Sequence, residues 1–221
     1  MVSLLASFDI GKKNFAFVIE EVDLTQLNLI QNVPASKRYN KDGTPTQEFD
    51  KLLTTLYKCG KVILVRNLDI TKDCDPSKYF DRNLFINMQN VLDEYISYWN
   101  RCDAFIVEQQ MSFGKNKSNT MAVKLGQHCQ SYFLLNYGKF KHVLEFPAYH
   151  KTQILGAPKA ERKTKPFRKK WAIQKALDIL ELRKDDKTLS DLTTKKKKDD
   201  MSDCLLMTIT FSYLCFIDGK I

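Results

Sequence analysis

The stretch SFDIGKKNFAF, residues 7–17, constrains the fold more than any other segment. An apolar run ends at Asp9, a glycine and two lysines follow, and a second run rich in aromatic and β-branched residues begins at Phe15. This pattern predicts two antiparallel strands joined by a tight turn. It also leaves a carboxylate at a strand end, where a lysine or a bound cation must compensate its charge.

Apolar periodicity predicts the remaining elements. We expect further strands over residues 60–70, 103–110 and 141–147, and an additional edge segment over 24–33. Helical spacing of apolar residues is found over 51–57, 80–99, 120–137, 169–182 and 200–217. Strands that come first and then alternate with helices are typical of an α/β domain with a mixed sheet. The chain is therefore interpreted as a single domain, residues 1–221.

The charge balance points to a polyanionic partner. The net charge is +9, from 35 Lys+Arg against 26 Asp+Glu, which favours nucleic acid or an anionic membrane surface. The longest apolar run, 204–217, is shorter than the roughly 20 residues that cross a bilayer, so we interpret it as a buried helix and expect no membrane partner. Six cysteines without a CxxC pair and three scattered histidines indicate reduced thiols in an intracellular protein, with no zinc site.

Carboxylates recur where strands end and where the last helix begins. Asp9 and Glu108 each follow an apolar strand, and Asp200 and Asp203 share one helix face at i, i+3 spacing. Asp199 also shares a face with Asp203, at i, i+4. Pairing with lysines and helix capping are the alternative interpretations. Together, four such carboxylates are suited to hold two Mg²⁺ or Mn²⁺ ions about 4 Å apart, as in phosphodiester hydrolysis.

Four segments in order resemble the motifs of the RuvC-like Holliday junction resolvases, a family of the RNase H-like superfamily. The segments are SFDIGKKNFAF, FIVEQQ, FPAYHKTQILGAPKAERKTKPFRKKWAIQKAL and KKKKDDMSDCLLM, and the resemblance runs from about residue 3 to 217. They are most similar to poxvirus-type resolvases of large DNA viruses, with mitochondrial fungal resolvases next. The resemblance implies an RNase H-like fold, a five-stranded mixed β-sheet flanked by α-helices, with insertions near 24–58 and 183–198.

The same resemblance implies which residues act. Asp200 is preferred over Asp199 because the family pattern is D-x-x-D. Lys151 matches the family lysine expected near the scissile phosphate, although an ordinary surface lysine is equally consistent with the sequence. The implied catalytic residues are Asp9, Glu108, Lys151, Asp200 and Asp203, and the four acids are the implied ligands of Mg²⁺ or Mn²⁺.

By resemblance, the chain is a structure-selective endonuclease that resolves four-way DNA junctions in recombination, replication and repair. The resemblance implies a homodimer, with the helix 120–137 in the position of the dimer helix and no nucleotide cofactor. The apolar residues of that helix (Met121, Leu125, Tyr132 and Phe133) are equally consistent with ordinary core. The expected location is the host cytoplasm for a viral protein, otherwise the mitochondrion or nucleus.

Basic residues cluster where a phosphate backbone would lie, and such contacts give affinity without sequence readout. The predicted nucleic-acid-binding residues are Lys115, Lys117, Lys151, Lys159, Arg162, Lys163 and Lys165. Phe113 and Tyr149 are candidates for stacking at the junction. The lysine run 195–198 is interpreted as a solvated, DNA-facing segment.

Two other functions remain open from sequence, and a third class lacks a motif that it requires. Within the same fold, the chain is compatible with an RNase H-type or other branched-nucleic-acid nuclease. A non-catalytic nucleic-acid-binding protein with a nuclease fold is a second alternative, against which the complete set of acids argues. Sugar-kinase and actin-like ATPases also begin with a D-I-G loop, but the second phosphate loop that they require is not found in the sequence.

Overall fold

A five-stranded mixed sheet forms the centre of the computed structural model, which describes residues 1–75, 77–78, 80–110, 120–194 and 197–221. The strand order is β3-β2-β1-β4-β5. The strands are β1 (Val2–Asp9), β2 (Phe15–Asp23), β3 (Gly60–Leu68), β4 (Ala104–Glu108) and β5 (His142–Phe146). This sheet confirms the predicted fold class and the predicted hairpin around Gly11.

Strand direction decides where the acidic strand ends lie. β1 pairs antiparallel with β2, so that Asp9 lies opposite Ala16, and it pairs parallel with β4. β4 in turn pairs parallel with β5. Because neighbouring parallel strands end at the same edge of a sheet, Asp9 and Glu108 reach the same edge.

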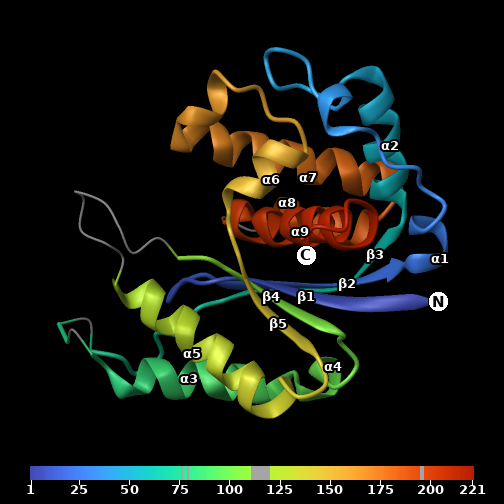
Figure 1. Ribbon diagram of the computed structural model, residues 1–221. Coiled ribbons are helices and arrows are strands. Elements are labelled where there is room, and N and C mark those ends of the chain that lie inside the picture. The colour runs from blue at the N-terminus through green and yellow to red at the C-terminus, as the bar shows by residue number, and fades with distance from the viewer. Residues whose placement is uncertain (76, 79, 111–119, 195–196) are drawn as a thin grey trace.

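Helices cover both faces of the sheet (Figure 1). One face carries α3 (Arg82–Glu94), α4 (Ile96–Trp99) and α5 (Thr120–Tyr137). Against the other face lies α9 (Lys198–Ser212), which ends in a π-helical turn, Tyr213–Ile217. Outside α9 lie α2 (Gln47–Lys58), α6 (Tyr149–Ile154), α7 (Lys165–Arg183) and α8 (Asp186–Thr194). Short turns complete the chain: α1 (Leu24–Leu27), Ala35–Lys37 and Glu161–Lys163.

Each face of the sheet packs a different core. On the α3–α5 side the core is aromatic, with Phe105 and Phe133 stacked at 4.0 Å between ring centroids and Trp99 fully buried beside them. On the α9 side the core is mostly aliphatic, from leucine, isoleucine, valine and methionine side chains. Burying large side chains on both faces supplies most of the stabilisation of such a layered fold.

Helix α9 is apolar on nearly every side because it is sandwiched between the sheet and α7. By length and composition alone, the 20 residues Lys198–Ile217 are long and apolar enough to span a membrane. In the described fold, 72% of that segment is buried against the rest of the chain. Core packing therefore accounts for its hydrophobicity, as predicted for a buried helix.

Two segments differ from expectation. The predicted edge segment over 24–33 is wrong: the chain forms the helical turn α1 there, because the Asp23 carboxylate accepts hydrogen bonds from the N–H groups of Thr25 and Gln26. The polar segment after residue 183 contains a helix, α8, whose Leu192 is buried in the core. Charge alternation along that segment obscured its short amphipathic pattern.

A buried ion pair ties the loop before α2 to the end of the chain. Arg38 Nη2 lies 2.5 Å from Asp218 Oδ1, and both side chains are at most 10% exposed. Asn32 Nδ2 also donates to Asp218 Oδ1, at 2.9 Å. Against the effect of burial, hydrogen bonds from Arg38 and Lys220 hold the pKa of Asp218 well below its usual range. The folded chain therefore favours the ionised carboxylate.

We expect Asp218→Asn to lower the free energy of unfolding at pH 7 by about 2 kcal/mol, because the buried Arg38 loses its charged partner. Since the pKa of Asp218 in the folded chain lies below the unfolded value of about 4, this stabilisation is present above that pH and is lost as pH falls. Urea unfolding at pH 5, 4 and 3 measures it. The difference between wild type and variant should shrink steadily, whereas a constant difference would contradict the assignment. Lys51→Ala, at an exposed side chain of α2, is the control and should cost about 0.5 kcal/mol or less.

Candidate active site

Two carboxylates lie side by side at the carboxyl edge of the sheet. Asp9 is the last residue of β1, and Glu108 is the last residue of β4. The strands are neighbours, with Phe8 paired to Val107 one position earlier. Both strands are buried in their interior, so the chain positions these two side chains rigidly.

A third carboxylate, Asp203, comes from the first half of α9. Buried hydrogen bonds anchor this helix to β1: Ser7 Oγ donates to the carbonyl of Cys204 at 2.8 Å, and Thr208 Oγ1 donates to Ser7 Oγ at 2.7 Å. The adjacent Asp203 is thereby carried to the sheet edge. One carboxylate oxygen each from Asp9, Glu108 and Asp203 lies within 4.8 Å of the other two, and we call these residues the acidic triad.

The ammonium group of Lys151 lies among these acids. Lys151 is on α6, directly after β5, and is 4% exposed. Its Nζ donates to Glu108 Oε1 at 2.8 Å and lies 3.2 Å from Asp203 Oδ1. Burial alone would lower the pKa of Lys151, but Asp203, Glu108 and Asp9 raise it above its usual value. The interpretation as an ordinary surface lysine is therefore wrong.

The acidic triad carries more negative charge than Lys151 offsets. Burial and the neighbouring Glu108 raise the pKa of Asp9 well above its usual value. Burial and the Glu108 charge also raise the pKa of Asp203. Glu108 is also desolvated, but the Lys151 ammonium beside it holds its pKa below the usual value. Three acids against one cation leave a site that favours added positive charge.

The two acids that begin α9 have different surroundings. Asp199 is buried and forms an ion pair with Lys169 of α7, whose hydrogen bond to Asp199 raises the pKa of that lysine. Asp200 is outside the acidic triad; burial and the nearby Asp199 raise its pKa to about 6. Asp203 is among the charges that raise the pKa of Asp200, and Asp199 is among those that raise the pKa of Asp203. The preference for Asp200 over Asp199 as the candidate fourth ligand stays a prediction.

Lys169 was not singled out by sequence reasoning. It lies in the basic stretch PFRKKWAIQKAL at the start of α7, where it is the middle one of three consecutive cationic residues and nothing in the sequence distinguishes it from the other two. The sequence did contain a signal for this region, because a helix was predicted directly after the basic segment of the motif FPAYHKTQILGAPKAERKTKPFRKKWAIQKAL. Its pairing with a particular aspartate of another helix depends on the packing of α7 against α9.

The other predicted nucleic-acid-binding residues divide into two groups. Lys115 and Lys117, like Phe113, lie outside the described residues. Lys159, Lys163 and Lys165 are exposed and Arg162 is half-buried, around the turn that leads into α7. Tyr149 is 54% exposed on α6, two residues before Lys151. The exposed basic residues and Tyr149 thus lie on or next to α6 and the start of α7, the helices that carry Lys151 and Lys169.

The acidic triad fits a hard divalent cation. Its donors are carboxylate oxygens, which Mg²⁺ and Mn²⁺ prefer, and they converge from three rigid elements. The raised pKa values of Asp9 and Asp203 reflect a repulsion that a bound cation would relieve. Asp9, Glu108 and Asp203 would hold the ion.

Solved structures with the same fold are Holliday junction resolvases. They include the fowlpox virus resolvase in complex with Holliday junction DNA (TM-score 0.55, 18% identity, 96% of this chain and 98% of that chain) and RuvC of Thermus thermophilus (0.53, 12%, 97% and 95%). The yeast mitochondrial Holliday junction resolvase Ydc2 is a third (0.57, 12%, 99% and 81%). The chain thus has the RNase H-like fold of the resolvases, a mixed sheet flanked by helices.

Two viral proteins are similar in sequence over nearly their whole length. The uncharacterized protein 170L of Invertebrate iridescent virus 6 is 36% identical over 233 aligned positions, covering 95% of this chain and 89% of that protein. The uncharacterized protein 97L of Invertebrate iridescent virus 3 is 34% identical, covering 92% and 97%. The chain belongs to the family of these iridescent virus proteins. No protein-family model matches it.

We expect Asp9→Asn to raise the melting temperature in the presence of a chelator by about 2–4 °C, because it removes a buried charge that the neighbouring acids repel. Glu108→Gln should lower it instead, since Lys151 loses its nearest partner. Differential scanning calorimetry with EDTA and with Mn²⁺ measures both effects. Mn²⁺ should stabilise the wild type by mass action and stabilise both variants much less.

Asp50→Asn, on the exposed face of α2, is the matched control. It should change neither the melting temperature in EDTA nor the stabilisation by Mn²⁺. An undiminished Mn²⁺ response in both triad variants would exclude the acidic triad as the metal site.

Proposed function

We propose that this protein is a structure-selective endonuclease that resolves four-way DNA junctions by metal-dependent hydrolysis of phosphodiester bonds. The observation that carries the proposal is the acidic triad with the buried Lys151 beside it, at the carboxyl edge of a resolvase fold. The similar structures named above are resolvases, and one of them is a complex with Holliday junction DNA. The catalytic residues of the proposal are Asp9, Glu108, Lys151, Asp200 and Asp203.

The acids hold Mg²⁺ or Mn²⁺, with two ions per site in this proposal, and such ions activate water and stabilise the leaving oxygen of a phosphodiester. The chain itself contributes the remaining steps. Rigid strand ends hold Asp9 and Glu108 at fixed positions, and the anchored α9 fixes Asp203. Lys151, held by two of the acids, places a positive charge where the scissile phosphate meets the acidic triad.

Electrostatics supports DNA as the substrate. A triad of acids by itself repels a phosphate backbone, so affinity must come from basic residues around it. The exposed Lys159, Lys163 and Lys165 lie on the approach to α7, and Lys169 lies directly beside the acids. Contacts of this kind are sequence-independent and weaken as salt rises. They are suited to a substrate recognised by its branched shape.

The cleavage test uses a labelled four-way junction in Mg²⁺ or Mn²⁺, with duplex DNA and an RNA–DNA hybrid as controls. We expect paired symmetric nicks in the junction. Asp203→Asn and Glu108→Gln should reduce the cleavage rate by roughly 100- to 1,000-fold, because each removes a group that stabilises the transition state. Junction binding, measured by gel shift in Ca²⁺, should be retained.

Preferential cleavage of the hybrid would assign the chain to the RNase H type instead. Junction binding without cleavage in either metal would identify a non-catalytic binding protein. Asp50→Asn serves again as the matched control, since it changes a carboxylate remote from the acidic triad.

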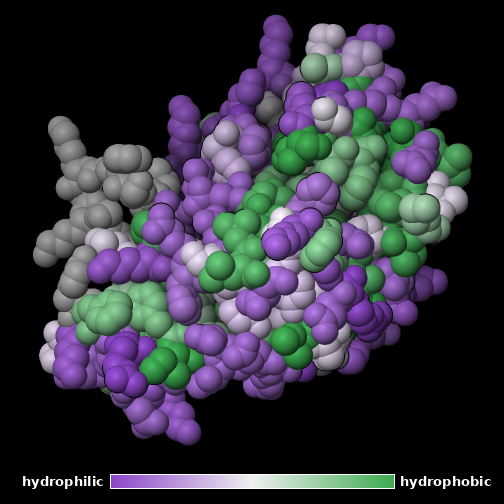
Figure 2. Space-filling model, turned by 60° about the horizontal axis from the view of Figure 1, so that its bottom comes forward, coloured by the Kyte–Doolittle hydropathy of each residue, from purple (hydrophilic) through white to green (hydrophobic). Residues whose placement is uncertain are grey.

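The proposal includes a homodimer, because resolving a junction requires two opposed cuts. Leu125 and Phe133 of α5 are buried in the monomer core, so they are not available to a partner. Leu134 and Leu135 are 54% and 87% exposed at the end of the same helix. Figure 2, which brings the α3–α5 side forward, shows hydrophobic patches on an otherwise hydrophilic surface. Exposed leucines on one helix suit a self-association surface.

We expect Leu135→Glu to convert a dimer into a monomer at micromolar concentration without loss of folding, because the leucine contacts little of its own chain. Sedimentation velocity measures the change. Leu29→Glu is the matched control, since Leu29 is an equally exposed leucine outside α5. A wild-type protein that sediments as a monomer, or a variant that remains dimeric, would exclude this surface.

The viral relatives support an infected host cell as the setting of the proposed activity. Both are proteins of iridescent viruses. Within that cell we propose the cytoplasm as the site of action, in recombination, replication and repair of viral DNA.

A further inference from the structure

A cleft lies away from the acidic triad. Its volume is about 630 Å³, and it lies between the beginning of β3 and the junction of α7 with α8. Cationic side chains dominate its lining: Lys58, Lys61, Arg183, Lys184 and Lys187. One acid, Asp185, lines it as well. We call this cavity the basic cleft.

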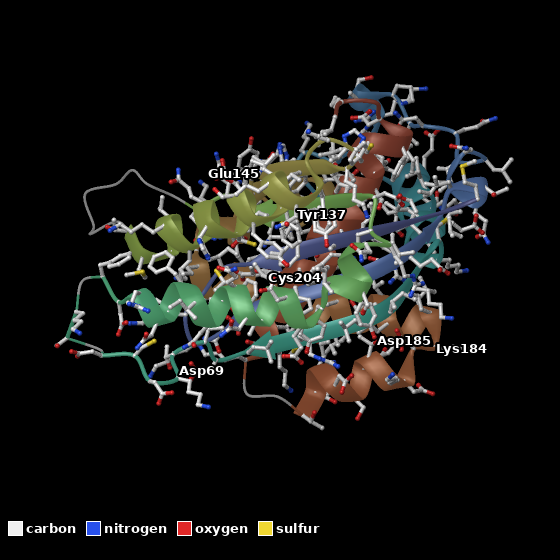
Figure 3. The ribbon with its side chains drawn as sticks, turned by 90° about the horizontal axis from the view of Figure 1, so that it is seen from below. Asp69, Tyr137, Glu145, Lys184, Asp185 and Cys204 are labelled. Carbon is white, nitrogen blue, oxygen red and sulfur yellow. The ribbon has the colours of Figure 1, made fainter. Side chains whose placement is uncertain are left out.

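The basic cleft and the acidic triad lie at opposite ends of the strands. Asp9 and Asn67 are both level with Ala16 of β2, whereas Gly60 is level with Val22. Six residues of strand separate the two levels, roughly 20 Å. Figure 3 shows Lys184 and Asp185 at one end of the molecule and Asp69, which follows β3, at the other.

The basic cleft is also electrostatically separate from the basic surface near the triad. Helix α7 connects the two regions, with Lys165 and Lys169 near its start and Arg183 at its end. Between them, Asp178 and Glu181 are exposed on the same helix. A continuous DNA track along α7 would meet these acids. The cleft is therefore suited to an anionic ligand of its own.

One wall of the basic cleft is an open sheet edge. β3 is an edge strand, and residues 60–63 line the cleft. Within the described part of the chain, no group outside the sheet forms a hydrogen bond with the backbone of residues 60–64. Apolar atoms of Val62, Ile63 and Leu182 line the cleft beside this edge. An edge of this kind offers backbone N–H and C=O groups to an added extended strand.

A buried ion pair makes the cationic wall rigid. Arg183 Nη2 lies 2.6 Å from Glu20 Oε1, and the two side chains are 5% and 1% exposed. Arg183 Nε also donates to the carbonyl of Tyr57. Nη1 of Arg183 has no hydrogen-bond partner among the described residues. A Cβ atom on Gly60 would lie 1.8 Å from Glu20 Oε1, so glycine is required where the edge strand passes this pair.

We propose that the basic cleft binds an acidic, extended peptide segment of a partner protein, laid alongside β3 as an added strand. The open edge can form hydrogen bonds with a peptide backbone. The apolar residues can contact every second side chain of the peptide, and the lysines can pair with carboxylates on the remaining positions. A strand edge alternates N–H donors and C=O acceptors. Phosphate oxygens only accept hydrogen bonds, so a peptide backbone suits this edge better than DNA does. This inference goes beyond the proposed nuclease function and does not depend on it.

The test measures binding of a fluorescein-labelled ten-residue peptide that alternates glutamate and valine, by fluorescence anisotropy with the full-length protein. The combined variant Lys61→Glu, Lys184→Glu and Lys187→Glu should raise the dissociation constant at least tenfold. A matched variant, Lys37→Glu, Lys51→Glu and Lys139→Glu, changes the net charge equally at exposed sites outside the cleft and should bind as the wild type does. A lysine–valine peptide should not bind.

Amide hydrogen exchange locates the peptide. With the glutamate–valine peptide bound, those amides of residues 60–64 that are not paired with β2 should become protected. Duplex DNA that protects the same amides and displaces the peptide would overturn the proposal in favour of a nucleic-acid surface. Absence of peptide binding, or equal weakening by both triple variants, would also overturn it.

Discussion

The ammonium of Lys151 is what allows three carboxylates to lie together at the carboxyl edge of the sheet. Three carboxylates within 4.8 Å of one another repel, and none is fully open to water that would screen them. A buried cation that contacts two of these carboxylates lowers the electrostatic repulsion among the three without cancelling it. The balance leaves net negative charge at a rigid position. This residual charge attracts divalent cations and gives the edge of the sheet its proposed chemistry.

The same edge depends on how α9 packs. The helix has to pass through the core beside β1 to deliver Asp203, and few polar groups are available there to fix its position. Ser7 and Thr208 supply two buried hydrogen bonds that connect the helix to the strand. Because such bonds are costly to break in the interior, the helix has one preferred placement relative to Asp9. The proposed metal site and core packing are thus coupled through one helix.

Charge is distributed unevenly along the molecule. One end of the sheet combines the acidic triad with the lysines that approach α7, and the other combines an open strand edge with the basic cleft. The acids Asp178 and Glu181 separate the two along α7. The two proposed functions would lie at opposite ends of the sheet and would not compete for the same surface. A nuclease arranged in this way would be able to hold a protein partner while its active site contacts DNA.

Local pattern in the sequence was enough to predict the hairpin around Gly11, the five strands and the acids that end two of them, because these features depend on neighbours in the chain. It was also enough for the resemblance that implied Lys151 and the fold. Several features had no local signal. The pairing of Asp199 with Lys169, the exclusion of Asp199 from the triad and the burial of Lys151 depend on helices brought together from distant segments. The basic cleft arises likewise, since Lys61 and Lys187 meet only after β3 and α8 are packed. Periodicity along the chain therefore determined the elements and their acidic ends, whereas tertiary packing decided which charges became partners, because a charge interacts with whatever lies within a few ångströms in space.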